Sequence, residues 1–278
     1  MRRYIIAIIG LMMSLALSAQ VTYTRADSLT ICKLLKQAPQ QASTLWFARQ
    51  FHGIPYVAHT LEVNNLEQLV VNTRELDCTT LVETVTALTL CVKQEKRQWT
   101  DYLQMLRTLR YRQGVLNGYT SRLHYFTDWI LDKQQMEFVE EIQQPNPPFT
   151  AVQRIDVDFM SQHPLYYKAL KADPALVPVI RQQEQALTGK TFRYIPKQEV
   201  KNTKLMRQTI KDGDIIAITC NKKGLEIAHL GFAVWQKDGL HLLNASQLHH
   251  KVVTEPMTLR QYLQKHKTHT GIRIIRIK

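Results

Sequence analysis

Cysteine is scarce in this chain of 278 residues, and its few cysteines do not follow the spacing of a disulfide scaffold or a zinc site. They are Cys32, Cys78, Cys91 and Cys220. No C-x-x-C or H-E-x-x-H sequence is present, so the ligand spacing of common metal sites is missing. A chain of this length can bury a sizeable core without disulfides. The sequence therefore implies no metal and no other cofactor.

Long apolar runs, internal repeats and low-complexity tracts are also missing. The beginning, MRRYIIAIIGLMMSLALSAQ, combines two arginines, an apolar run over residues 4–17 and the small residues Ser18 and Ala19. The run is shorter than the roughly 20 residues of a membrane-spanning helix, and its layout is typical of a secretory signal peptide. We expect residues 1–19 to be a signal peptide, with a permanent anchor as the alternative. The rest of the chain is then exported to the periplasm or cell envelope.

Acidic residues are too few to balance the basic ones, which gives a net charge of +13. The basic residues are dispersed and form no block with interleaved aromatic residues, so the charge does not predict nucleic-acid binding. A basic exported protein fits an anionic environment such as a membrane surface, a cell wall or an acidic polymer. A merely solvated surface explains the charge equally well. The sequence contains no indication of the oligomeric state.

The order of the expected elements predicts an α+β fold. Helical spacing and capping residues predict helices first, over residues 27–37, 41–53, 79–92, 99–109, 125–135 and 166–187. Short β-rich segments follow at residues 213–219, 225–235, 239–246 and 271–278, separated by turn sequences such as NKKG and KDG. We expect these segments to form an antiparallel sheet.

A turn-rich break, QQPNPPF, divides the chain at residues 143–149. It could separate two domains. The apolar patterns on its two sides depend on one another, however, because neither the helices nor the strands can bury their apolar faces alone. We therefore predict one domain over residues 20–278, with helical additions.

Cys78 lies at the expected start of the helix over residues 79–92. Free N–H groups and the positive end of a helix stabilise a thiolate and could hold an oxyanion. The neighbouring Asp77 disfavours the thiolate unless its carboxylate turns aside to cap the helix. Cys32 and Cys91 lie among apolar helical residues, and we predict that both are core residues. On these grounds Cys78 is either another core cysteine or a nucleophile.

A cysteine nucleophile needs a base and a group that orients this base. Among ten histidines, His229 is distinctive because it interrupts an apolar strand. The two strands on either side of QKDG should form a hairpin. With a two-residue loop, His229 shares one face of the hairpin with Asn244 and Ser246, while His241 points to the other face. Asn244 is the predicted orienting residue and Ser246 is the second choice; a three-residue loop would reverse the assignment.

A metal site is the competing interpretation of the same residues. Cys78, His124, Glu226 and His229 could be imagined as its ligands. Their spacing matches no known metal-binding motif, and we therefore predict no metal.

Two blocks of the sequence resemble NlpC-type papain-like cell-wall cysteine hydrolases. GIPYVAHTLE…LDCTTLVE resembles the family's G-x-P-Y…D-C-[ST]-x-L/F-V signature, and KDGDIIAI…AHLGFAVWQKDGLHLLNAS resembles its second block. More narrowly, NTRELDCTTLVET and SRLHYFTDWI are similar to a branch described as N-acetylmuramoyl-L-alanine amidase-like. The resemblance implies a papain-like fold, with the nucleophile at a helix N-terminus packed on the C-terminal antiparallel sheet.

The resemblance also implies a role for single residues. Cys78 matches the nucleophile, His229 the base and Asn244 the third polar position. Tyr56 matches a tyrosine that lines the site near the oxyanion. Asp77 is then a helix cap or local support.

Further positions are implied to bind substrate. Arg122, His124 and Tyr125 are expected to line the substrate cleft of the amidase-like branch, and Ser246 is expected to contribute to it. A structural hydrogen-bond cluster is an equally good interpretation of the first three. The Trp-Gly-Gly that usually follows the family tyrosine is Ala58-His59-Thr60 here, and this departure favours the amidase-like branch over the common endopeptidases.

The implied reaction is hydrolysis of the amide bond between N-acetylmuramic acid and L-alanine, in peptidoglycan or in soluble muropeptide fragments. One alternative is a γ-D-glutamyl-type endopeptidase that cuts inside the stem peptide. Another is acyl transfer to an acceptor other than water. A wall-binding protein without activity is the non-enzymatic alternative.

Overall fold

The computed structural model describes residues 21–278. The expected signal peptide at residues 1–19 lies outside the described residues. Within residues 21–278, none of the helices has both the length and the apolar character needed to cross a bilayer.

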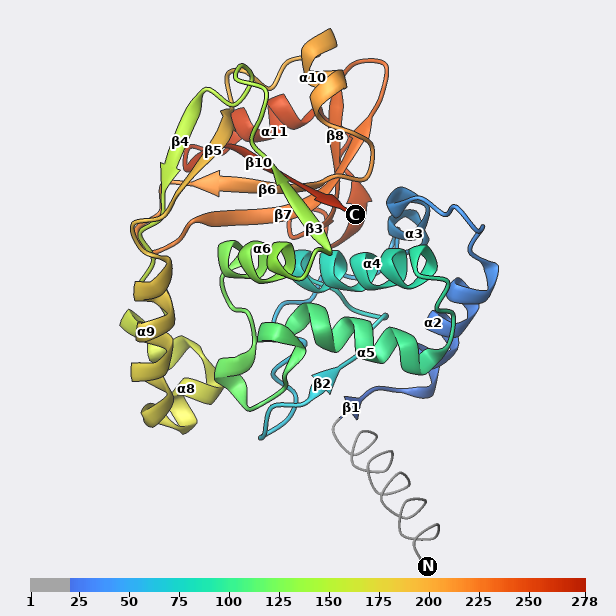
Figure 1. Ribbon diagram of the computed structural model, residues 1–278, viewed down its shortest axis with the longest axis vertical. Helices are drawn as coiled ribbons and strands as arrows, with labels where there is room; N and C mark the ends of the chain where they lie inside the picture. The colour runs from blue at the N-terminus through green and yellow to red at the C-terminus, as the bar shows by residue number, and fades with distance from the viewer. Residues whose placement is uncertain (1–20) are drawn as a thin grey trace, which may run out of the picture.

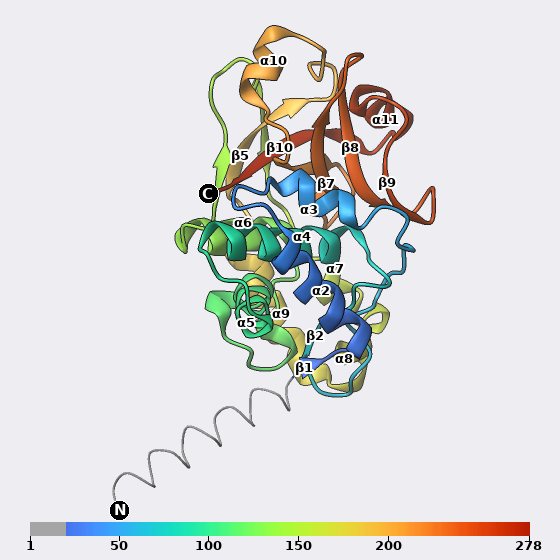
Figure 2. The same ribbon diagram turned by 90° about the vertical axis from the view of Figure 1, so that its right-hand side faces the viewer.

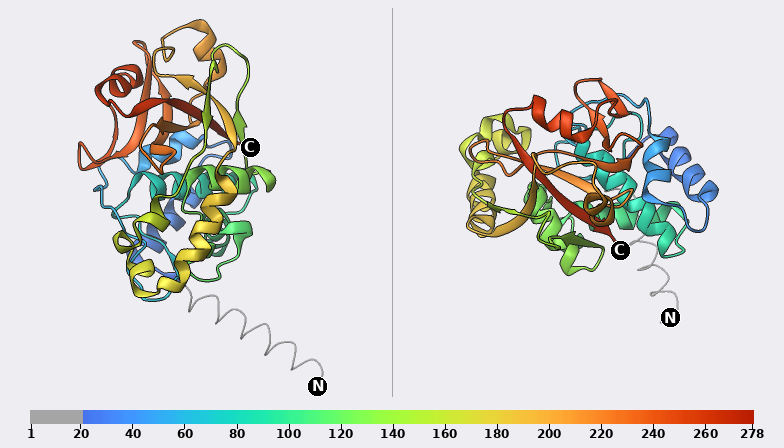
Figure 3. Two further views of the ribbon diagram at one scale, coloured as in Figure 1. Left: turned by 90° about the vertical axis from the view of Figure 1, so that its left-hand side faces the viewer. Right: turned by 90° about the horizontal axis from the view of Figure 1, so that it is seen from above.

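Helices α2 to α6 fill about half of residues 21–149 and lie together on one side of the sheet, whereas α10 and α11 lie on its other side (Figures 1 and 2). The longer ones are α2 (Arg25–Gln37), α3 (Thr44–Gln50), α4 (Cys78–Lys93), α5 (Trp99–Arg110), α6 (Phe126–Gln135) and α9 (Val177–Leu187). The shorter ones are α7 (Phe159–Gln162), α8 (Lys168–Ala172), α10 (Lys204–Thr209) and α11 (Leu259–Lys265). The α8 and α9 helices lie together at the lower left of Figure 1 and face the viewer in Figure 3, left.

An eight-stranded antiparallel sheet forms the other layer. Its order is β4 (Ala151–Arg154), β5 (Thr191–Pro196), β10 (His269–Ile277), β6 (Ile215–Cys220), β7 (Ile227–Trp235), β8 (Leu240–Ser246) and β9 (Lys251–Thr254), with β3 (Val139–Ile142) also paired to β10. Two further strands, β1 (Val21–Thr22) and β2 (Leu69–Val70), form a separate parallel pair. The predicted α+β class and C-terminal antiparallel sheet are confirmed.

The α4 helix lies between the sheet and α5 and is buried along almost its whole length (Figure 1). Along β7, alternate residues such as Leu230 and Phe232 join the core on the helical side of the sheet. Ala233 joins a second core on the opposite side, which includes residues of α10 and α11. The alternation of strand side chains thus lets one sheet close two cores.

The expected single helix over residues 166–187 is wrong. The structure has α8 and α9 instead, with a break at Asp173 and Pro174. Proline lacks an N–H, and its ring disfavours a helical conformation of the preceding residue. The Asp173 carboxylate accepts a hydrogen bond from the Ala175 N–H at 3.1 Å and starts a new turn.

Two smaller expectations also need correction in α2. Thr24, rather than Asp27 or Ser28, is its N-cap residue, and Asp27 completes the capping box from inside the first turn. Cys32 is exposed, not a core residue, because α2 turns Ile31 and Leu35 toward the core. The prediction that Cys91 is buried is confirmed.

Candidate active site

Cys78 is the first residue of α4. Asp77 is the N-cap residue, and its Oδ1 accepts hydrogen bonds from the backbone N–H and the hydroxyl of Thr80, both at 2.8 Å. The Thr80 hydroxyl in turn accepts from the Asp77 N–H at 2.9 Å. The carboxylate is therefore turned into the helix end, and the half-buried Cys78 thiol lies beside the free N–H groups of the first turn.

The hairpin of β7 and β8 carries the other two candidate residues. Trp235 pairs with Leu240, and the Gln236 N–H donates to the Gly239 carbonyl at 2.8 Å, which closes a two-residue loop. This is the predicted register. It brings His229 and Asn244 together, with Nε2 of the imidazole 2.8 Å from Oδ1 of the amide.

This contact defines which ring nitrogen of His229 carries a proton. An amide oxygen can only accept, so Nε2 must donate. The other nitrogen, Nδ1, is not engaged by the amide, and Cys78 borders the same cavity as the ring. Burial lowers the pKa of His229, but the negative charge and hydrogen bond of Cys78, together with the hydrogen bond to Asn244, raise it, and the raising effects prevail.

A cavity of about 240 Å³ opens beside these residues. Its lining includes Cys78, Thr79, His124, Tyr125, Phe126, Met160, Tyr167, residues 225–228, His229 and Leu230. Glu226 contributes the only carboxylate of this lining. Its two oxygens accept from the N–H groups of Thr127, at 2.9 Å, and Ile227, at 2.6 Å, so this carboxylate is held at the N-terminus of α6.

His124 and Tyr125 border this cavity, and a hydrogen bond to another part of the protein holds each side chain in place. His124 Nε2 donates to the Tyr119 carbonyl at 3.0 Å, and the Tyr125 hydroxyl donates to Glu184 at 2.7 Å. Burial and then the positive charge of Arg122 lower the pKa of His124 to about 3. The ring is therefore neutral near pH 7, and its Nδ1 is an acceptor.

Arg122 lies outside this cavity. Its guanidinium donates to Glu62 at 2.9 Å and to Glu67 at 2.7 Å, and it lies over the ring of Tyr119 with 4.9 Å to the centroid. The side chain is buried. Arg122 therefore belongs to a buried ion-pair cluster. For this residue, the arrangement agrees with a structural hydrogen-bond cluster rather than with a substrate cleft.

Tyr56 and Ser246 also do not border the cavity. Tyr56 packs against the same core as Cys78, and burial, followed by the charges of Cys78 and Asp77, raises the pKa of its phenol. Ser246 is buried, and its hydroxyl accepts from the His249 N–H at 3.4 Å.

Sequence reasoning missed several residues of this site, among them the cavity-lining Met160 and Tyr167 and the fully buried Glu255. Its carboxylate accepts from Asn244 Nδ2 at 3.0 Å and contacts His249 Nε2 at the same distance. Glu255 follows β9 in a short loop and belongs to no recognisable motif. Nothing in the surrounding sequence, VVTEP, marks Glu255 as a residue of the site.

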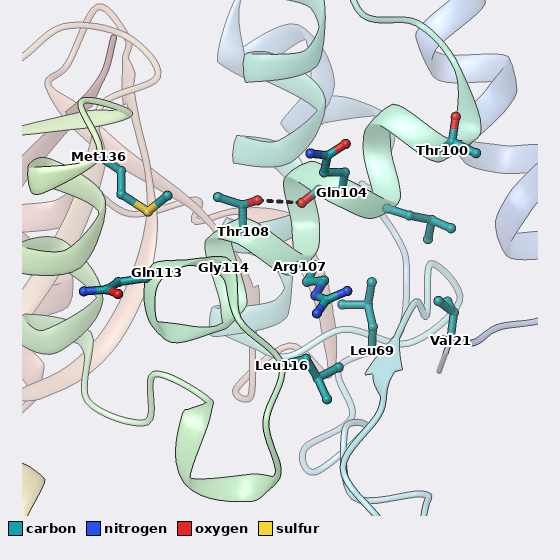
Figure 4. Close-up of a pocket in the computed structure, with 11 residues that line it drawn as sticks. Val21, Leu69, Thr100, Gln104, Arg107, Thr108, Gln113, Gly114, Leu116 and Met136 are labelled. Atoms are coloured by element: carbon teal, nitrogen blue, oxygen red, sulfur yellow. Dashed lines mark hydrogen bonds between the residues drawn. The ribbon is translucent and has the colours of Figure 1, made fainter. Parts of the chain in front are cut away.

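A second cavity, of about 490 Å³, lies between β2 and α5, and Figure 4 shows its lining. Arg107 is the only charged residue of this lining, and no cysteine or histidine borders it. It therefore offers no nucleophile and base of the kind found beside Cys78. Among residues 21–278, no three histidine, cysteine or acidic side chains are gathered as metal ligands, and the four imagined ligands form no such group.

Comparison with known proteins places the chain near cell-wall amidases. Residues 46–272 match the AmiA-like family, described as N-acetylmuramoyl-L-alanine amidase-like. A crystal structure of an N-acetylmuramoyl-L-alanine amidase from Bacteroides uniformis is 40% identical, with a TM-score of 0.79, over 86% of this chain and 99% of that one. No curated protein matches the chain significantly.

Two other solved structures carry different descriptions. A Bacteroides fragilis protein named as a candidate xylanase is also 40% identical, with a TM-score of 0.77, over 83% of this chain and 99% of that one. A Legionella pneumophila protein is 22% identical, with a TM-score of 0.69 over 95% of this chain and 96% of its own, which shows a shared fold alone.

Proposed function

The chain belongs to the AmiA-like family of N-acetylmuramoyl-L-alanine amidase-like proteins, and from that membership we propose that it cleaves the amide bond between N-acetylmuramic acid and L-alanine in peptidoglycan, with Cys78 as nucleophile. One observation carries the proposal. Cys78 and His229 border the same cavity, and Asn244 holds the Nε2–H of His229. The proposed nucleophile, base and orienting group are thus spatial neighbours, with the base between the other two, as cysteine hydrolysis requires.

The arrangement of elements supports a papain-like fold. The nucleophile begins a buried helix, α4, which packs on the strands β7, β8 and β10 of the antiparallel sheet. His229 and Asn244 come from two of these strands. Nucleophile and base therefore lie on different elements that meet at the cavity.

In the first half of the reaction, Nδ1 of neutral His229 takes the proton of the Cys78 thiol, and the resulting thiolate attacks the lactyl carbonyl carbon of the muramic acid. A C–S bond forms, and the carbonyl electron pair moves to oxygen, where the N–H groups at the start of α4 stabilise the oxyanion. The oxyanion then collapses and the C–N bond breaks. The proton on Nδ1 of His229 goes to the nitrogen of L-alanine, which leaves as the free stem peptide.

In the second half, water releases the acyl group. Nδ1 of His229 takes a proton from the water, whose oxygen attacks the thioester carbon. The C–S bond breaks and returns the Cys78 thiolate, while His229 is again protonated. Asn244 holds Nε2–H throughout both halves and keeps Nδ1 directed at the reacting atoms.

The description of one relative as a xylanase does not transfer to this site. Glycoside hydrolysis typically needs two carboxyl groups on either side of the scissile bond. The lining of the cavity beside Cys78 contributes one carboxylate, Glu226, and both of its oxygens accept backbone N–H groups. The residues present fit acyl chemistry better than glycosyl chemistry.

The expected location and charge agree with a wall substrate. A secretory signal at residues 1–19 would direct the protein to the periplasm or cell envelope. Peptidoglycan stem peptides carry several carboxylates, which a protein of net charge +13 attracts. The mechanism requires no cofactor.

Digestion of purified muropeptides, followed by mass spectrometry of the products, tests the proposal. An amidase releases the intact stem peptide and leaves the sugar without any amino acid. A sugar that retains a dipeptide would identify an endopeptidase instead. If both products are absent while the protein still binds the wall, the non-catalytic alternative holds, and a new amide or ester product would identify acyl transfer.

A further inference from the structure

The amide group of Asn244 is held in one orientation by acceptors on its Nδ2 side. Nδ2 lies 3.0 Å from Oε1 of Glu255 and 3.4 Å from the carbonyl oxygen of Leu242. Because a carboxylate and a carbonyl only accept, the amide must direct its NH₂ group toward them. Oδ1 is then the atom that faces His229.

Glu255 is itself fixed through its main chain. Its N–H donates to the Leu242 carbonyl at 2.8 Å, and its carbonyl accepts from Nδ1 of His241 at 2.9 Å. The residue is fully buried, and its second carboxylate oxygen lies 3.0 Å from His249 Nε2. A buried carboxylate with this many fixed contacts cannot turn away from Asn244 without losing several hydrogen bonds.

The orientation of Asn244 matters for catalysis because the amide has two different ends. With Oδ1 toward His229, Nε2 carries the proton and Nδ1 is free to act as a base toward Cys78. With the amide turned over, NH₂ would face the ring, Nε2 would become the acceptor, and the neutral ring would carry its proton on Nδ1. That tautomer cannot accept a proton at the nitrogen that faces Cys78.

We propose that Glu255 is a positioning residue that fixes the amide orientation of Asn244 and thereby keeps the proton of neutral His229 on Nε2. The proposal rests on the proposed role of His229 as base. Glu255 does not border the cavity; its carboxylate bonds to Asn244, and its negative charge also raises the pKa of His229.

Other titratable groups also face His229. Tyr262 of α11 lies 6.5 Å from its ring, centroid to centroid; the ring of His269 stacks on Tyr262, and the ring of His266 packs against it at a tilt. Cys78 faces it from α4. None of the three aromatic neighbours bonds to Asn244, so they do not define the direction of its amide.

The tautomer can be measured without any activity. In the Cys78→Ala protein, ¹⁵N shifts of the histidine rings, recorded at a pH where His229 is neutral, report which nitrogen carries the proton. We expect Nε2–H with Glu255 present and a loss of this preference in Cys78→Ala with Glu255→Leu. A Glu255→Gln variant should retain Nε2–H, because its amide oxygen can still accept from Asn244. If Glu255→Leu keeps the Nε2–H form, the proposal is wrong.

Kinetics in the Cys78 protein give a second, independent readout. Glu255→Leu should lower kcat about tenfold or more with little change in KM, and Glu255→Gln should recover much of this loss. In an Asn244→Ala background, Glu255→Leu should have a much smaller effect, because only the charge of Glu255 on His229 is then lost; the same loss in both backgrounds would show that Glu255 does not act through Asn244.

Asp27→Asn is the matched control, since Asp27 is another fully buried, hydrogen-bonded carboxylate, located on α2. It should change neither the tautomer nor the kcat of the folded protein. If the wild type fails to cleave muropeptides while the ¹⁵N result holds, the proposed function is wrong and the role of Glu255 stands.

Discussion

Nε2 of His229 lies 2.8 Å from Oδ1 of Asn244. The two residues are 15 positions apart in the sequence and meet because they lie on the paired strands β7 and β8. The contact depends on a two-residue hairpin loop, because one more residue in the loop would turn Asn244 to the other face of the sheet. The register of this hairpin thus determines whether His229 has an orienting partner. The same ring borders the cavity that Cys78 also lines.

Removal of the thiol should abolish hydrolysis. Cys78→Ala leaves no nucleophile, and we expect kcat for muropeptide cleavage to fall by at least about 10⁴-fold. Cys32→Ala is the control, because Cys32 is also accessible but lies on α2, and it should leave kcat unchanged. Liquid chromatography of the digests measures both; comparable cleavage by Cys78→Ala would refute cysteine catalysis.

Removal of the orienting amide should change the pH dependence of the reaction. The hydrogen bond to Asn244 raises the pKa of His229, so in Asn244→Ala that pKa should fall. Since His229 must be protonated to release the amine, the limb on which activity is lost with rising pH should move to lower pH, and kcat should fall about tenfold or more.

The control for this change is Asn202→Ala. Asn202 hydrogen-bonds to Lys237 at the turn of the same hairpin, at 3.3 Å, and lies away from His229. Its pH–rate profile should match that of the wild type. An unchanged alkaline limb in Asn244→Ala would contradict the assigned role of Asn244.

Arg122 should contribute to stability and little to the chemical step. Arg122→Leu leaves the carboxylates of Glu62 and Glu67 without their cation, and we expect the free energy of unfolding to fall by about 3–5 kcal/mol. Urea denaturation measures this change. The exposed Arg207, which lies over Trp235 at 4.4 Å, is the control, and Arg207→Leu should cost about 0.5–1 kcal/mol. A stable Arg122→Leu protein with a raised KM would instead indicate a substrate contact.

His124 should make the fold less stable in acid. Its pKa is about 3 in the folded protein, against about 6.5 in the unfolded chain. Between these values the unfolded state binds the extra proton, so the stability from neutral His124 is present above about pH 6.5 and is lost as the pH falls toward 3.

Urea denaturation at several pH values tests this sign. His124→Gln can keep the hydrogen bond to the Tyr119 carbonyl but cannot be protonated, so its stability should fall less steeply than that of the wild type between pH 6.5 and 4. His163→Gln, which alters an exposed histidine, should follow the wild type. Parallel curves for His124→Gln and the wild type would contradict the lowered pKa.

Local patterns were sufficient to predict some elements from the sequence, but not others. The helices α5 and α6 and the β7–β8 hairpin follow directly from apolar periodicity and a short turn. The short strands β3 and β5 were not predicted, because β3 is defined by its pairing to the distant β10, and β5 by its pairing to β4 and β10. Such pairing depends on tertiary contacts that no short window of sequence contains.

The candidate site, too, could be predicted from the sequence only in part. The sequence predicted the face shared by His229 and Asn244, because strand parity is a local property. It could not reveal that Glu255 lies behind Asn244, since the direction of a loop side chain depends on the surrounding fold. It also could not decide whether Arg122 faces substrate or the two carboxylates that surround it.

The central claim, that Cys78 carries the muramoyl group during hydrolysis, can be tested by trapping the covalent intermediate. The protein is mixed with a muropeptide, quenched in acid within a single turnover and analysed by peptide mapping in a mass spectrometer. We predict a thioester on Cys78 whose added mass is that of the lactyl-linked sugar without any amino acid. An adduct that contains the sugar and a dipeptide, or rapid cleavage with no adduct on Cys78, would contradict the account.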